Sequence, residues 1–165
     1  MSKPKIGFIG LGAMGKPMAR RLLEAGYEVA SCANRNRAPI EELEQIGLVD
    51  AGTAKAVVES ADIVMLVVWD EAQIDGILRG ENAALRSMKA GSTVFLMSTI
   101  SPDYCRALAT EASKRDVTVL DCPLAGMPIG AENGTLSLML GGEVEDIEAH
   151  RATLEVLGTI YHCGP

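Results

Sequence analysis

The sequence lacks the side chains that metal centres and disulfide frameworks need. Its four cysteines form no CxxC pair, and only two histidines are available to join them. Because a structural zinc site takes four closely placed Cys or His ligands, we expect no bound metal. Unpaired thiols are typical of the reducing cytoplasm, and we therefore expect a cytoplasmic protein.

Positive charge is also scarce, and long apolar runs are missing. The formal net charge is -7 at pH 7, which argues against binding to nucleic acid or to an anionic membrane surface. The first apolar run is too short and too rich in glycine for a signal peptide or a membrane helix. The expected partner is therefore a small-molecule substrate, with no nucleic acid and no membrane.

Aromatic residues are rare, at 4% of the chain, whereas hydrophobic residues reach 48%. The core must therefore be aliphatic, built from Val, Ile, Leu, Met and Ala. A length of 165 residues suits one domain, so we expect a single domain over residues 1–165.

Short apolar stretches alternate with amphipathic ones along the whole chain. Strands are expected at residues 5–9, 28–32, 48–49, 62–68, 93–97, 117–120, 136–140 and 159–162. Helices are expected at 13–25, 39–46, 53–60, 71–88 with a break near Gly80, from Ser101 onward, and at 144–157. Residues 122–134, rich in Pro and Gly, are expected to form a loop. The predicted fold is α/β, a Rossmann-type doubly wound, mostly parallel sheet with helices on both faces.

A glycine-rich turn follows the first expected strand and opens the first expected helix. It has the GxGxxG pattern, formed by Gly10, Leu11, Gly12, Ala13, Met14 and Gly15. In this position the first glycine permits a tight turn, the second lets the backbone approach a pyrophosphate, and the third lets helix and strand pack closely. The free N–H groups at the helix start would face the phosphates. The sequence therefore predicts a dinucleotide site, the alternative being a plain strand–helix turn.

The residues after the second expected strand bear on the choice of dinucleotide. An NAD site normally has Asp or Glu there to hold the ribose hydroxyls. This chain has no acid at that point but the run Asn34, Arg35, Asn36 and Arg37. Because arginines attract a 2′-phosphate and an acid would repel it, we expect Arg35 and Arg37 to clamp NADP(H) in preference to NAD(H), with the two asparagines as polar helpers. The alternative is an ordinary solvated loop.

Three segments together resemble the β-hydroxyacid dehydrogenase family, which includes 3-hydroxyisobutyrate dehydrogenase and the N-terminal domain of 6-phosphogluconate dehydrogenase. They read IGFIGLGAMGKPMA at 6–19, MSTISP at 97–102, and DCPLAG at 121–126, which continues as GAENGTL at 130–136 and MLGG at 139–142. Imine reductases share much of this layout, so the resemblance leaves the substrate open.

The resemblance implies roles for residues at the ends of several strands, where ligands bind in open α/β sheets. The turn from Gly10 to Gly15 would hold the pyrophosphate, and Asn34, Arg35 and Asn36 would meet the adenosine end. Further cofactor contacts would come from Val67, Val68, Trp69, Ser98 and Thr99, and the substrate pocket would be lined by Leu124, Ala125 and Gly126. Two alternatives stay open: Ser98 and Thr99 as a helix-capping pair before Pro102, and Trp69 as a partly buried aromatic.

Two departures from the family pattern bear on function. Where family dehydrogenases usually have Ser-Gly-Gly, this chain has Ala125, Gly126 and Met127, which removes a hydroxyl and adds a thioether. The family's catalytic lysine lies in a second, all-helical domain that also makes most of the dimer, and we expect that C-terminal domain to be absent from this chain. His150 is expected to lie in mid-helix and to be solvated.

The resulting hypothesis is the cofactor-binding half of an NADP-dependent oxidoreductase of the β-hydroxyacid dehydrogenase type. The parent enzyme would transfer hydride between NADP(H) and a small hydroxyacid, semialdehyde or related carbonyl or imine, and would form a homo-oligomer through its C-terminal domain. The alternative is a non-catalytic NADP-binding module acting as a sensor or in assembly. The 165 residues alone would be inactive or weakly active, since the general acid would lie elsewhere.

Overall fold

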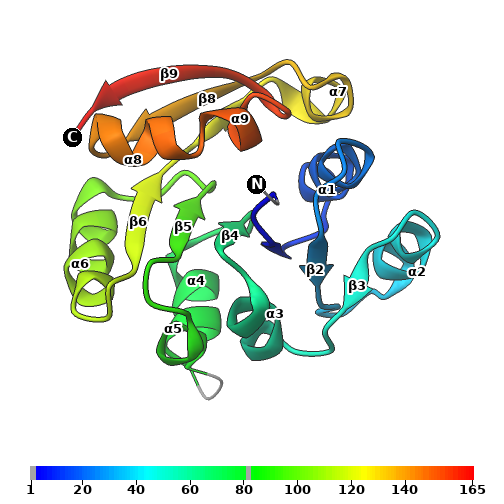
Figure 1. Cartoon of the computed structure of the whole chain (residues 1–165), viewed down its shortest axis with the longest axis horizontal. Helices are drawn as coiled ribbons and strands as arrows, with labels where there is room; N and C mark the ends of the chain where they lie inside the picture. The colour runs from blue at the N-terminus through cyan, green and yellow to red at the C-terminus, as the bar shows by residue number, and fades with distance from the viewer. Residues whose placement is uncertain (1–2, 81–82) are drawn as a thin grey trace.

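A computed structural model describes residues 3–80 and 83–165, and one sheet runs through them (Figure 1). Six parallel strands come first along the chain: β1 (Ile6–Ile9), β2 (Val29–Ser31), β3 (Val49–Asp50), β4 (Ile63–Leu66), β5 (Thr93–Leu96) and β6 (Thr118–Asp121). Their order, β3-β2-β1-β4-β5-β6, reverses direction at β1, which starts the sheet in its middle. This doubly wound order confirms the predicted Rossmann-type fold, whose ligands bind where the strand order reverses.

The sheet continues past β6 with strands of mixed direction. These are β7 (Leu124–Ala125), β8 (Leu136–Gly141) and β9 (Gly158–Gly164). β8 runs antiparallel to both β6 and β7, and β9 runs parallel to β8. The expected mostly parallel sheet is therefore correct, with two antiparallel pairings, β6 with β8 and β7 with β8, in its last third.

Helices cover both faces of the sheet, and the strand side chains alternate between them. On one face α1 (Gly15–Glu24), α2 (Ala38–Glu44), α7 (Met127–Asn133), α8 (Val144–Ala149) and α9 (Arg151–Leu154) share a core cluster with Ile63 and Met65 of β4. On the other face α3 (Ala54–Ser60), α4 (Glu71–Leu78), α5 (Ala84–Ser87) and α6 (Pro102–Ser113) pack with Val64 and Leu66. Burial on both faces explains why β1, β4 and β5 are apolar at nearly every position.

The loop expected at residues 122–134 is wrong, because this segment contains strand β7 and helix α7. Pro128 lies in the first turn of α7, where its missing N–H costs little, and Gly134 ends the helix with a φ of 67°. Gly130 and Ala131 form the buried side of the helix. The Pro and Gly residues that indicated a loop therefore belong to a short helix: Pro128 starts it, Gly130 lies on its packed face, and Gly134 ends it.

The helix expected at 144–157 divides at His150 into α8 and α9, and His150 is not solvated as expected. Its Nε2 lies 2.9 Å from Oγ1 of Thr93 on β5, and its ring packs edge-on against Phe95 with centroids 5.5 Å apart. The surrounding core lowers the pKa of the imidazole through desolvation, which nearby Asp146 partly opposes. His150 is thus a half-buried neutral side chain that ties the helical layer to the sheet.

Candidate functional site

The parallel strands end level with one another, which gathers the predicted site residues at one edge of the sheet. Ile9 lies opposite Leu66, and Leu66 lies opposite Leu96. Leu96 in turn lies opposite Asp121. The segments that leave these strands are the Gly10–Gly15 turn and the runs that contain Val67 to Trp69, Ser98 to Thr99 and Leu124 to Gly126. They all begin at the carboxyl edge, where open α/β sheets bind ligands.

Two glycines of the first turn are required by the backbone around them. Gly10 has a φ of 104°, and a Cβ on it would lie 2.0 Å from the carbonyl oxygen of Val67. A Cβ on Gly15 would lie 1.8 Å from the carbonyl oxygen of Gly10. Backbone atoms cannot yield by that much, so both positions must stay glycine for β1, β4 and α1 to approach this closely.

Gly12 is different, because a Cβ built on it would meet no atom within 4 Å. Packing inside the protein therefore gives no reason for glycine at this position, whereas close approach of a ligand to the backbone does. Met14 leaves α1 without a side-chain cap, and the first turn holds no acidic residue. The uncapped N–H groups and the positive end of the helix dipole fit an anionic group, so the turn suits a pyrophosphate.

Arg37 is held by a carboxylate that the sequence analysis did not single out. Its Nη2 lies 2.7 Å from Oδ2 of Asp50, the last residue of β3, which pairs with β2. A hydrogen bond from the Gly52 N–H and the Arg37 guanidinium lower the pKa of Asp50, so this acid stays ionised. A signal was available in the sequence, since Asp50 follows the expected strand stub at 48–49.

The rest of the 34–37 run is exposed and differs from residue to residue in its contacts. Asn36 accepts a hydrogen bond from the N–H of Ala38 at the start of α2, with Oδ1 3.0 Å away. Asn34 and Arg35 are exposed at the end of β2. Within residues 3–80 and 83–165 no carboxylate lies within 4 Å of the Arg35 guanidinium. Arg35, and not Arg37, is therefore the cation with the more accessible charge here.

Ser98 is buried and fastens the end of β5 to the end of β4. Its Oγ accepts a hydrogen bond from the N–H of Val68 at 3.3 Å and donates one to the Val68 carbonyl oxygen. The helix that follows is capped by Ser101, whose Oγ accepts from the N–H of Tyr104 at 3.1 Å. The capping alternative for Ser98 and Thr99 is therefore wrong, and Thr99 is left exposed beside the half-buried Val67 and Val68.

Trp69 projects from the end of β4 with 87% of its surface exposed. Its main-chain N–H donates to Oε1 of Gln73 at 3.2 Å, and its indole lies outside the core. The alternative of a partly buried aromatic is wrong. A large exposed ring at the ligand edge of a sheet is available for stacking against a planar ligand.

The predicted substrate residues lie where the chain reverses between β7 and α7. Leu124 and Ala125 pair with Leu138 and Ser137 of β8, and Ala125 and Gly126 are exposed. Gly126 has a φ of 136°, and Met127 follows with a φ of 59° and 73% exposure. A methionine in this left-handed region is strained, and such strain is frequent at ligand sites.

Asp121 is a second acid that the sequence analysis did not assign to the site. It is the last residue of β6, and its Oδ1 is buried with no hydrogen-bond partner among the described residues. Burial raises the pKa of this carboxyl, and a hydrogen bond from the Cys122 N–H partly opposes this by lowering it.

Across residues 3–80 and 83–165, no helix has the length and apolarity to cross a membrane. In the same residues no three His, Cys, Asp or Glu side chains gather as metal ligands.

Comparison with known proteins gives relatives over the whole described length. The chain is 38% identical to 2-hydroxy-3-oxopropionate reductase from Escherichia coli over 154 residues, which are 93% of this chain and 52% of that protein. Mycobacterium tuberculosis 3-hydroxyisobutyrate dehydrogenase, solved with L-serine, superposes with a TM-score of 0.90 at 27% identity, covering 99% of this chain and 55% of that one. The imine reductase from Myxococcus stipitatus in complex with NADP+ superposes with a TM-score of 0.86 at 28% identity, covering 98% and 55%.

The chain spans little more than half the length of these relatives. Its fold, its glycine turn and the named dehydrogenases and reductases agree on one family of NAD(P)-binding oxidoreductases. The family model for the NAD binding domain of 6-phosphogluconate dehydrogenase matches residues 5–164. The chain therefore belongs to this family of NAD-binding domains, as the resemblance of its three motifs predicted.

Proposed function

We propose that this chain is the cofactor-binding half of an NADP-dependent oxidoreductase of the β-hydroxyacid dehydrogenase type. The observation that carries the proposal is Gly12, a glycine with open space around its missing Cβ, between two glycines that the backbone itself requires. Gly10, Leu11, Gly12, Ala13, Met14 and Gly15 would hold the pyrophosphate. The bound cofactor supplies hydride chemistry, while the protein supplies orientation and electrostatics.

The preference for NADP(H) over NAD(H) rests on charge at the end of β2. Arg35 is exposed and Arg37 is held by Asp50, and we expect these two guanidinium groups to flank a ribose 2′-phosphate. Asn34 and Asn36 complete this end of the site. Structurally similar imine reductases were solved with NADP+ and, for one variant, with NAD+, so they support a dinucleotide site and leave the preference to this charge.

The nicotinamide and substrate ends would be formed by the strand ends further along the sheet. Val67, Val68, Trp69 and the segment Ser98 to Thr99 would contact the cofactor. Leu124, Ala125 and Gly126 would line the pocket for a small carbonyl, hydroxyacid or imine, in keeping with the names of the relatives. The general acid would come from a C-terminal helical domain, through which the parent enzyme would also form a homo-oligomer.

A titration with NADPH and NADH tests cofactor binding directly. Trp69 is the only tryptophan and lies at the expected site, so its fluorescence reports from one place. We expect NADPH to quench Trp69 at lower concentration than NADH. Gly12→Ala is the decisive variant, because its methyl group meets nothing in the protein and the fold should persist. An unchanged affinity of a folded Gly12→Ala chain would contradict the proposed pyrophosphate site.

A non-catalytic NADP-binding module is the second candidate. Ala125 favours it, since this exposed side chain lacks the hydroxyl that would help to hold a substrate carboxylate. The two candidates differ in one measurement: the longer protein that carries this domain either oxidises or reduces small hydroxyacids, semialdehydes or imines with NADP(H), or binds NADP(H) without turnover. Binding in the absence of turnover would support the module.

A further inference from the structure

One half-buried arginine has no carboxylate partner and instead joins two segments that lie far from it in the sequence. Arg21 is in the last turn of α1, the helix that follows the glycine turn. In the described part of the chain, no Asp or Glu oxygen lies within 4 Å of its guanidinium. Its Nε donates to the carbonyl oxygen of Val156 at 2.9 Å, and its Nη1 donates to that of Glu132 at 3.2 Å.

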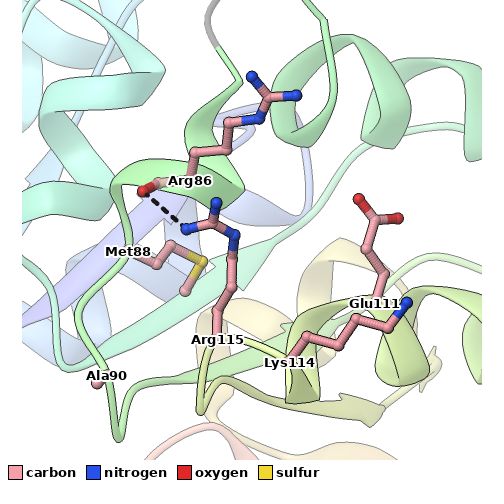
Figure 2. Close-up of a pocket in the computed structure, with 6 residues that line it drawn as sticks. All are labelled: Arg86, Met88, Ala90, Glu111, Lys114 and Arg115. Carbon is pink, nitrogen blue, oxygen red and sulfur yellow. Dashed lines mark hydrogen bonds between the residues drawn. The ribbon is translucent and has the colours of Figure 1, made fainter.

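Three other cations that lack an acid partner among the described residues do not come together in this way. Arg86, Lys114 and Arg115 line a groove between α5 and α6, and Figure 2 shows their charged ends pointing in different directions. Arg115 donates there to the carbonyl oxygen of Arg86 at 3.4 Å. Arg21 differs from them because its guanidinium binds two separate segments at once.

The contact with Glu132 satisfies the C-terminal end of α7. The last four carbonyl groups of a helix have no partner within it, and a cation is favoured beside them. Glu132 is the last residue but one of α7, and this helix has no basic residue in its own last turn. Because α1 and α7 lie side by side (Figure 1), Arg21 supplies the missing cation from α1.

Gly134 leaves the space that this guanidinium occupies. It ends α7 with a φ of 67°, and a Cβ on it would lie 2.4 Å from both Cζ and Nε of Arg21. A side chain at this position would therefore have to displace the guanidinium. Glycine is required here for two reasons, the left-handed turn and the approach of Arg21.

The opposite end of α7 is the strained turn beside the proposed substrate pocket. Before this turn, Leu124 and Ala125 are fixed by their pairing with β8. After it, α7 is fixed by Arg21 at its far end. Met127 lies between these two fixed flanks with a φ of 59°. A residue with a Cβ keeps such a φ only where the surrounding structure holds it there, so Arg21 is one of the contacts that maintain the strain.

We propose that Arg21 is a positioning residue, which holds the strained turn at Gly126 and Met127 in a fixed place relative to α1. Since α1 follows the cofactor turn and residues 124–126 line the substrate pocket, this link would set the distance between cofactor and substrate. The roles of these two ends rest on the proposed function, whereas the dependence of the strain at Met127 on Arg21 does not.

A cycle of melting temperatures tests the link in this chain without any ligand. Met127→Gly relieves the strain and should raise the melting temperature of the wild-type chain by roughly 2–4 °C. In an Arg21→Met background the same substitution should give less than about half of that gain, because α7 is no longer held at its far end and the turn has already relaxed. Methionine keeps the apolar stem of Arg21, so the fold should persist.

Arg20→Met is the matched control, since Arg20 is the preceding residue on α1 and pairs with Glu42 of α2. In this background Met127→Gly should keep its full effect. Arg21→Lys retains the charge without the fork of donors and should behave like Arg21→Met. Equal gains in the Arg20→Met and Arg21→Met backgrounds would overturn the proposal. It would be overturned as well by a wild-type gain in Arg21→Lys, or by no gain from Met127→Gly in the wild-type chain.

Kinetics of the longer protein that carries this domain add a readout that stability alone would not move. Arg21→Met should lower kcat by about tenfold while the Kd for NADPH stays within about twofold of wild type, because hydride transfer depends on the distance between cofactor and substrate. An unchanged kcat would overturn the positioning role. A wild-type protein that binds no NADPH would contradict the proposed function alone, since the melting cycle uses no cofactor.

Discussion

Arg37 donates a hydrogen bond to Asp50 across 2.7 Å, so a cation assigned to the cofactor phosphate is already paired with an acid. Asp50 is itself fixed, because its Oδ1 accepts from the Gly52 N–H at 2.9 Å. The Asp50 carboxylate raises the pKa of Arg37 and keeps that guanidinium charged and oriented. Under the proposed function a 2′-phosphate would therefore have to share Arg37 with Asp50, and the balance between these two anions would set the cofactor preference.

Asp50→Asn should improve binding of NADPH relative to NADH by several-fold. The substitution removes a negative charge beside the expected 2′-phosphate and releases Arg37 to it, while NADH has no phosphate there to benefit. Arg35→Gln should act in the opposite direction, with a loss of about tenfold for NADPH and little change for NADH. Both ratios are obtained from Trp69 quenching.

Arg106→Gln is the control for this pair, since Arg106 is exposed on α6 and pairs only with Asp103 in the described chain. It should leave both affinities unchanged. A shift of the preference toward NADH in Asp50→Asn would contradict the proposal, because it would mean that Asp50 does not lie beside a 2′-phosphate.

The features that sequence predicted well are those fixed by local chemistry. Gly10 and Gly15 lie in a turn whose tightness requires glycine, and two-sided burial makes β4 continuously apolar. These constraints act within a few residues or within one strand, so they can be recognised in the sequence as a glycine pattern and as apolar runs. The Rossmann-type sheet and its parallel strands are predicted from these two patterns.

The features that sequence did not predict depend on contacts between distant segments. Asp50 meets Arg37 because β3 pairs with β2, and His150 meets Thr93 because α8 and α9 cover β5. Ser98 turns inward to Val68, a residue 30 positions earlier. A helix in the Pro- and Gly-rich stretch at 127–133 was hidden because the same residues that start and stop a short helix also build loops.

Met127→Gly should stabilise the chain. The φ of 59° at Met127 is unfavourable for a residue with a Cβ, and proline at the next position restricts it further. Because the side chain is 73% exposed, its removal loses little burial. Relief of about 1 kcal/mol should raise the melting temperature by roughly 2–4 °C, as calorimetry would show.

Ile129→Gly tests whether this gain comes from backbone strain. Ile129 lies two residues later on the same helix, is 59% exposed and has no positive φ. Glycine there should lower stability by about 0.5–1 kcal/mol, because it only adds freedom to the unfolded chain. A melting temperature that falls in both variants would contradict strain at Met127.

Stability should decrease as the solution is acidified below about pH 6.5, and His150 should account for part of this loss. Burial lowers the pKa of His150 in the folded chain below its ordinary value, so the unfolded chain takes up this proton first. The contribution of the neutral ring is therefore fully present above the unfolded pKa and is lost as the pH falls toward the folded pKa. The negative charge of Asp146, which raises the pKa of His150, limits the size of the effect.

Urea unfolding between pH 5 and 8 measures this dependence when wild type is compared with His150→Gln. The variant should be less stable at pH 8 because it loses the contacts with Thr93 and Phe95, and its stability should change less with pH in this window. A slope for His150→Gln that stays parallel to that of wild type would contradict the assignment.

Ser98→Ala should destabilise the chain by about 1–3 kcal/mol, because the N–H of Val68 loses its partner in a partly buried position. The hydroxyl also donates to the Val68 carbonyl oxygen, so one substitution releases both ends of the link between β4 and β5. Thr99→Val changes an exposed neighbour and should leave stability within about 0.5 kcal/mol of wild type. Chemical denaturation gives the stability of both variants.

NADPH titration of the same two variants separates a structural role from a role in binding. Thr99→Val should weaken binding without loss of stability if its hydroxyl contacts the nicotinamide ribose, whereas Ser98→Ala should weaken binding together with a loss of stability. Equal stability of Ser98→Ala and wild type would show that the buried hydroxyl does not hold these strand ends together.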